Sequence, residues 1–100
     1  MATTSKVLFR GAASTSNTTL YTVPAATTAV VTNIVITNTA GTAATFDLAL
    51  DGVQLANDTS VAANSIAVFE IKQVLGAADL IEGSASATSV NFHISGVEIA

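Results

Sequence analysis

A hairpin signal in the middle of the chain places the strongest constraint on the fold. Phe46, Leu48 and Leu50 alternate with polar or small residues, which is the period of a strand that has one buried and one solvated face. Asp51 and Gly52 follow, and a second short β-prone run comes after them. Because Asp and Gly both tolerate positive φ, this dipeptide predicts a tight turn between two antiparallel strands.

The rest of the chain repeats this arrangement of short β-prone runs separated by turn residues. Pro24 ends one run, since proline cannot donate to a strand ladder, and the apolar parity shifts at Gly96, which predicts a β-bulge there. Residues 73–82 contain apolar residues at helical spacing, but Gly76 interrupts them, so we favour two short strands around a turn at 76–79. The other strands are predicted at residues 6–10, 19–23, 28–38, 45–51, 53–55, 66–71 and 89–99, with a further short strand near 60–62. About eight short strands without a convincing helix indicate an all-β fold, namely an antiparallel β-sandwich of jelly-roll or immunoglobulin-like type.

The length of the chain corresponds to a single sandwich domain over residues 1–100. Residues 1–5 are polar, and we expect them to form a mobile N-terminal tail. Residues 56–65 are polar and rich in turn formers, so a loop is predicted there around the short strand. The run 28–38 has apolar residues on both parities, which is typical of a central strand covered on both sides for part of its length. The residues predicted to be buried are Phe46, Leu48, Leu50, Phe69, Phe92 and Ile94.

The composition predicts a folded chain with little charge on its surface. Half of the residues are hydrophobic and 10% are charged, against roughly a quarter in an ordinary globular protein. The net charge of −4 argues against binding to a nucleic acid, and no apolar stretch approaches the ~20 residues of a membrane span. We therefore expect neither a nucleic acid nor a membrane as a partner. A weakly charged surface favours permanent contact with neighbouring subunits, and the alternative is a mildly acidic monomer.

No motif in the sequence predicts catalysis, a cofactor or a metal ion. His93 is the one histidine and lies on the polar parity of its strand, so we expect it to face solvent. Asp47, Asp51 and Asp58 surround the central hairpin and could offer oxygen ligands to Ca²⁺, but their spacing matches no calcium loop and turns favour Asp in any case. We predict a non-enzymatic protein with no catalytic, cofactor-binding or metal-binding residues.

The first predicted strand holds the one candidate interaction site. Lys6 and Arg10 bracket the apolar residues Val7, Leu8 and Phe9. One interpretation is an edge strand that is protected by charge. The other is a basic arm that reaches away from the sandwich and docks on a neighbouring subunit, where apolar burial dominates because exposed ion pairs are weak.

From Leu20 onward the sequence resembles a family of small virion proteins of tailed bacteriophages and prophages. The resembling stretches are residues 20–25 (LYTVPA), 29–38 (AVVTNIVITN), 48–52 (LALDG), 61–65 (VAANS) and 95–99 (SGVEI). The resemblance implies a β-sandwich component of the virion, either a capsid decoration (cement) protein or a module of the tail apparatus. It further implies a homo-oligomer, most often a trimer, whose partner is the major capsid protein or another virion protein. The family has no catalytic residues to carry over.

The short chain favours a decoration protein that stabilises the phage head, since a fibre subunit normally needs a longer shaft or a separate receptor domain. The alternative is a tail-fibre or adhesion module that binds glycans of the host surface. The N-terminus lacks the basic and apolar segments of a secretion signal. We therefore expect the protein to be made in the cytoplasm of the host bacterium and to be located in the virion.

Overall fold

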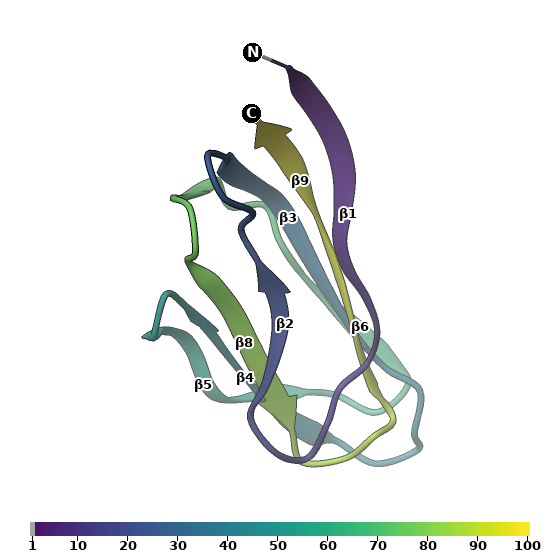
Figure 1. Ribbon diagram of the computed structural model, residues 1–100. Coiled ribbons are helices and arrows are strands. Elements are labelled where there is room, and N and C mark those ends of the chain that lie inside the picture. The colour runs from purple at the N-terminus through teal and green to yellow at the C-terminus, as the bar shows by residue number, and fades with distance from the viewer. Residues whose placement is uncertain (1) are drawn as a thin grey trace.

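The computed structural model describes residues 2–100, which contain nine strands and no helix (Figure 1). The strands are β1 (Thr3–Ala12), β2 (Thr18–Thr22), β3 (Thr28–Asn38), β4 (Ala44–Leu50), β5 (Val53–Val61), β6 (Ser65–Phe69), β7 (Gln73–Leu75), β8 (Leu80–Ala85) and β9 (Val90–Ile99). Sheet A has the order β1-β9-β3-β6, with β7 also paired to β3, and sheet B has the order β2-β8-β4-β5. Every pairing is antiparallel. The predicted all-β antiparallel sandwich is confirmed.

The strand order is that of a jelly roll rather than an immunoglobulin-like sandwich. The β4–β5 hairpin lies at the middle of the chain, and outward from it β3 pairs with β6 and β7, β2 with β8, and β1 with β9. The chain is thus one long hairpin rolled across two sheets. As a result its two ends lie side by side (Figure 1). The amide of Ala2 donates to the carbonyl of Ala100 at 3.0 Å, and the amide of Ala100 donates back at 2.9 Å.

The core fills the space between the sheets with the inward-facing residues of both. The ring of Phe46 from sheet B lies 6.1 Å from that of Phe92 in sheet A, at an interplanar angle of 70°, which is the edge-to-face geometry that aromatic pairs prefer. Of the residues predicted to be buried, Phe46, Leu48, Leu50, Phe92 and Ile94 are buried, while Phe69 is half-buried and packs against them. Parity along each strand therefore identified the core, and Phe69 differs because it lies on the edge strand β6.

Both predicted turns are present. Asp51 and Gly52 have φ values of 52° and 77°, and positive φ at both central positions defines the tight hairpin between β4 and β5. At the second turn, the Asp79 amide donates to the Gly76 carbonyl at 3.0 Å, and the Asp79 carboxylate accepts from the Gly76 amide at 2.8 Å. This turn separates β7 from β8, which confirms two strands over residues 73–82.

The first strand begins at Thr3, so the predicted mobile tail is wrong for residues 3–5. These residues pair with residues 97–99 of β9 along the edge of sheet A. Polar residues extend the strand here because their backbone groups find partners on β9 while their side chains stay exposed. Met1, the first residue of the predicted tail, lies outside the described residues.

The loop predicted over residues 56–65 is wrong for residues 56–61, because β5 continues to Val61, while residues 62–64 form the predicted loop before β6. Its register against β4 shifts twice, around Leu48. Asp58 adopts a φ of 46°, and its amide donates to a carboxylate oxygen of Asp47 at 2.6 Å. The turn-forming residues thus form bulges within β5, and β5 is paired with β4 both before and after these bulges.

The bulge predicted at Gly96 lies on the neighbouring strands instead. The register of β9 shifts against β1 at Leu8, opposite the step from Ile94 to Ser95, and against β3 at Thr32, opposite the step from Ser95 to Gly96. A Cβ atom on Gly96 would come within 2.3 Å of the Val30 carbonyl oxygen. Glycine is therefore needed here because bulged backbone on β3 approaches closely, and not because β9 itself is bulged.

Candidate interaction surface

The side of sheet A that points away from sheet B carries a group of apolar side chains. Val30 on β3 lies opposite Val74 on β7 and Val97 on β9, and Val35 lies opposite Val68 on β6. Paired residues share one side of a sheet. Val97 and His93, the β9 partners of Val30 and Val35, are four positions apart, so both sets point to the same side. We call this group the apolar face, and it consists of Val30, Val35, Ile66, Val68, Val74 and Val97. Contiguous exposed apolar surface of this kind marks interaction sites.

The exposure of this face follows from the two-sided pattern of β3. Ile34 and Ile36 point into the core and are fully buried, whereas Val35 between them points outward and is half-buried. On the neighbouring edge strands, Ile66 is 64% exposed and Val74 is 71% exposed. The sequence predicted a central strand covered on both sides for part of its length, and within this chain the outward side chains of β3 are half-buried.

The outward side of sheet B is polar and acidic instead. Asp47 and Ser84 lie opposite each other on it, as do Ala49 and Glu82. The Asn17 side-chain amide donates to Glu82 at 3.3 Å. Among residues 2–100, the large apolar side chains that are exposed are Val7, Val53, Leu55, Ile66, Val68 and Val74, and none of them lies on this side. The two broad sides of the molecule therefore offer very different chemistry to a partner.

The predicted interaction segment is divided between the two sides of strand β1. Leu8 is buried and Phe9 is half-buried against the core, because the bulge directs both of them inward. Val7, which is 43% exposed, and Arg10 point outward beside Ser95 and His93. The arm that reaches away from the sandwich is wrong, and the segment is an edge strand.

Lys6, the remaining residue of that segment, takes part in a contact between the two sheets. Its ammonium lies 3.3 Å from both carboxylate oxygens of Glu98 on β9. The Tyr21 hydroxyl, on β2, donates to the same carboxylate. The hydrogen bond from Tyr21, and then the Lys6 charge, lower the pKa of Glu98. Burial, followed by the Glu98 carboxylate, raises the pKa of Tyr21. This cluster closes the β1–β2 side of the sandwich.

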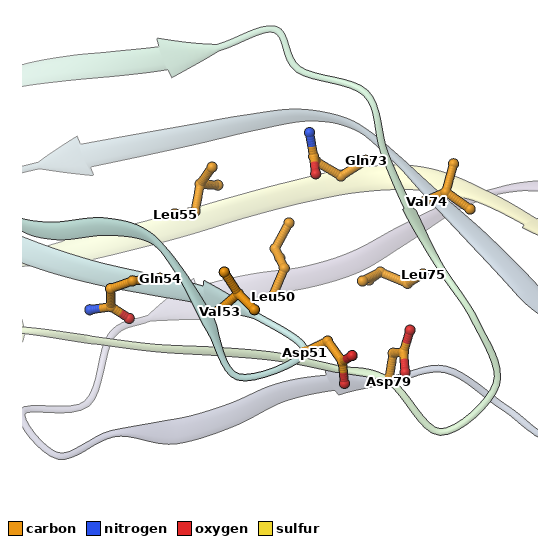
Figure 2. Close-up of a pocket in the computed structure, with 9 residues that line it drawn as sticks. All are labelled: Leu50, Asp51, Val53, Gln54, Leu55, Gln73, Val74, Leu75 and Asp79. Atoms are coloured by element: carbon orange, nitrogen blue, oxygen red, sulfur yellow. The ribbon is translucent and has the colours of Figure 1, made fainter.

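The opposite side of the sandwich has a groove between β5 and β7 (Figure 2). Leu50 and Leu75 are its buried floor, and Val53 on its wall is 70% exposed. The carboxylates of Asp51 and Asp79 lie close together at one end. The groove has a volume of about 290 Å³ and is lined by Leu50, Asp51, Val53, Gln54, Leu55, Gln73, Val74, Leu75 and Asp79. We call it the β5–β7 groove.

The aspartates considered as Ca²⁺ ligands take part in the hydrogen bonds and turns of the fold. Asp47 accepts a backbone hydrogen bond from Asp58, and Asp51 lies in the hairpin turn. Within the described part of the chain, no three His, Asp or Glu side chains are grouped so that they could hold a metal ion. His93 points outward between Arg10 and Val35, as its parity predicted. None of residues 2–100 belongs to a helix that could cross a bilayer.

No family model, curated protein or solved structure matches this chain. The resemblance to phage virion proteins therefore stays a prediction, as does an interaction role for residues 6–10. Sequence reasoning missed the apolar face and the groove. The sequence contained a signal for the apolar face, since β-branched residues occupy both parities of residues 28–38. The groove left no signal in the sequence, because it forms between β5 and β7, which are not consecutive strands.

Proposed function

We propose that this protein is a non-enzymatic structural component of a virion, a capsid decoration protein that docks on the major capsid protein through its apolar face. The observation that supports the proposal is the contrast between the two broad sides of the sandwich. Ile66 and Val68 are 64% and 49% exposed on one side, while the other side carries carboxylates such as Asp47 and Glu82. A protein with this division packs on a partner with the first side and keeps the second in water.

The dimensions of the molecule suit such an interface. Its broad side measures 46 × 21 Å, on the order of 900 Å², and an interface of standard size buries ~800 Å² on each partner. Fully burying a Val or Ile side chain contributes ~1.5–3 kcal/mol. A few such residues offset the cost of immobilising one molecule on another.

A glycan-binding adhesion module is less well supported. Flat aromatic rings usually stack on sugars, and here Phe46 and Phe92 are buried in the core. Phe9, Phe69 and Tyr21 pack against that core. The aromatic side chains of the described residues thus serve the sandwich itself.

Particle binding by a double variant tests the proposal. Ile66→Thr combined with Val68→Thr keeps β-branched residues on the strand, so the unfolding transition should stay nearly unchanged. Binding to capsids that lack the protein, measured by co-sedimentation, should weaken at least about tenfold, which corresponds to ~1.4 kcal/mol. Ser60→Thr, at an exposed position on β5 outside both the apolar face and the β5–β7 groove, is the control and should bind normally. Undiminished binding by the double variant would contradict the proposal, and binding to host glycans in place of capsids would favour the adhesion alternative.

A further inference from the structure

We infer that copies of this protein associate head to tail, with the outward residues of β1 from one copy seated in the β5–β7 groove of the next. This contact does not depend on docking through the apolar face, with which the groove shares one residue, Val74. Outside that face, the exposed large apolar residues of the described chain are Val7 on β1 and Val53 and Leu55 at the groove. Both elements thus retain apolar surface that the sandwich does not cover.

The groove offers apolar walls with negative charge at one end. Val53 and Leu55 are 70% and 40% exposed along β5. Asp51 and Asp79 contribute the carboxylates (Figure 2), and no Lys, Arg or His lines the groove. The surface fits a ligand with a branched apolar group next to a cation.

Strand β1 presents that combination. Val7 and Arg10 point to the same side of the sheet, because their partners on β9 are Ser95 and His93, two positions apart. Two positions along a strand correspond to ~7 Å, a separation that a single groove can span. Arg10 makes no ion pair among residues 2–100, where the one ion pair is Lys6–Glu98. Its charge is therefore available to a partner.

The topology requires that the contact be made between two copies. Strand β1 lies at one edge of sheet A, whereas β7 lies at the far edge and β5 at the corresponding edge of sheet B (Figure 1). The two surfaces cannot meet within one chain. A contact between different surfaces is heterologous, so it produces a closed ring or a filament. A ring is consistent with the trimer expected from the resemblance.

Charge complementarity selects this arrangement over a symmetric one. Two β1 strands face to face would bring their Arg10 side chains together, and two grooves face to face would bring Asp51 and Asp79 against the same pair. Like charges across an interface oppose association, whereas Arg10 opposite Asp51 is attractive.

Sedimentation velocity over a range of concentrations tests the inference. The wild-type protein should self-associate, and Arg10→Glu should weaken this on the order of tenfold because it replaces attraction by repulsion. Asp51→Asn keeps a residue that tolerates positive φ and should weaken association. Asp58→Asn also changes an exposed aspartate with positive φ, but outside the groove, and should have no effect. Adding Gln54→Lys to Arg10→Glu should restore association. A monomeric wild type, or association that Arg10→Glu leaves unchanged, would overturn the inference.

Disulfide trapping gives a second test, since the chain has no cysteine. Val7→Cys protein mixed with Val53→Cys protein should form a covalent heterodimer under oxidising conditions. Neither variant alone should cross-link, and homodimers of Val7→Cys would instead indicate a symmetric contact. Ile66→Thr with Val68→Thr should still self-associate even where particle binding is lost. The two proposals can therefore fail separately.

Discussion

Asn38 is one polar side chain that joins distant loops. It is 2% exposed and is the buried polar residue of the described chain. Its amide nitrogen donates to the carbonyls of Thr42 at 2.8 Å and Val61 at 3.3 Å. Its oxygen accepts from the Ala40 amide and the Ser89 hydroxyl, both at 3.1 Å. These bonds connect the β3–β4, β5–β6 and β8–β9 connections at one end of the sandwich.

Asn38→Ala should lower the free energy of unfolding by ~2–3 kcal/mol, because it leaves buried carbonyl groups without their donor. Chemical denaturation of the wild type and the variant measures the loss. Asn57→Ala, at an exposed position on β5, is the matched control and should change stability little. A loss below ~0.5 kcal/mol for Asn38→Ala would show that water replaces the amide without cost.

Glu98 predicts a specific dependence of stability on pH. Its pKa in the folded protein lies below the ordinary value of 4.5, because Tyr21 donates to the carboxylate and Lys6 lies beside it. A lowered pKa contributes stability that is present above the ordinary value and is lost as the pH falls through the folded value. The wild type should therefore lose stability in acid, and Glu98→Gln should lose less over the same range. Thermal unfolding across that range, with Glu70→Gln as the exposed control, is the measurement, and parallel curves for wild type and Glu98→Gln would contradict the assignment.

Strand β9 lies inside sheet A, where it pairs with β1 on one side and with β3 on the other. The bulge at Leu8 lies opposite the step from Ile94 to Ser95, and the bulge at Thr32 lies opposite the next step, from Ser95 to Gly96. The bulge on β1 turns Leu8 toward the core, where it is buried. Because Gly96 has no side chain, Val30 on β3 and Leu8 on β1 can both pack closely against β9.

Gly96→Ala should destabilise the protein by ~1–3 kcal/mol, because the added Cβ overfills a packed site. It would lie 2.3 Å from the Val30 carbonyl oxygen and 3.0 Å from a Leu8 methyl group. Gly41→Ala is the matched control, since no atom lies within 4 Å of a Cβ at that position. Equal stability of the two variants in denaturant would mean that β3 moves away freely.

In the jelly-roll topology the outermost strand pair, β1 and β9, joins the two ends of the sequence. Strands β1 and β9 pair along their full length, yet the rest of the chain separates them. Such distant pairing slows folding, since the loop must close before the contacts form.

A circular permutant should fold faster than the wild type. Residue 100 would be joined to residue 2 by a short glycine linker, and the chain opened between Ser16 and Asn17 in the exposed β1–β2 connection. The β9–β1 pair then becomes a local hairpin, which lowers the contact order. Stability should stay within ~1 kcal/mol, because adjacent ends tolerate permutation. Stopped-flow refolding measures the rate, and an unchanged rate would show that β1 docks after the rate-limiting step.

The sequence determined the strands whose signals are local. Alternation at Phe46, Leu48 and Leu50 identified the inner side of β4, and Asp51-Gly52 identified the turn, because side-chain parity and φ preference depend only on neighbouring residues. The run at residues 28–38 matched β3 at both ends for the same reason. The one helical signal, the apolar spacing over residues 73–82, is interrupted by Gly76, and these residues form β7, a turn and the start of β8.

Tertiary structure decided the features that depend on which strands become neighbours. Residues 3–5 and 56–61 carry weak strand signals, and they form strands because β9 and β4 supply hydrogen-bonding partners. The role of Gly96 depends on backbone that approaches from β3. The apolar face and the β5–β7 groove likewise arise from strands that are adjacent only after the chain has rolled up. Parity assigns each side chain to one of two sides of its strand, but strand order decides which side is left uncovered.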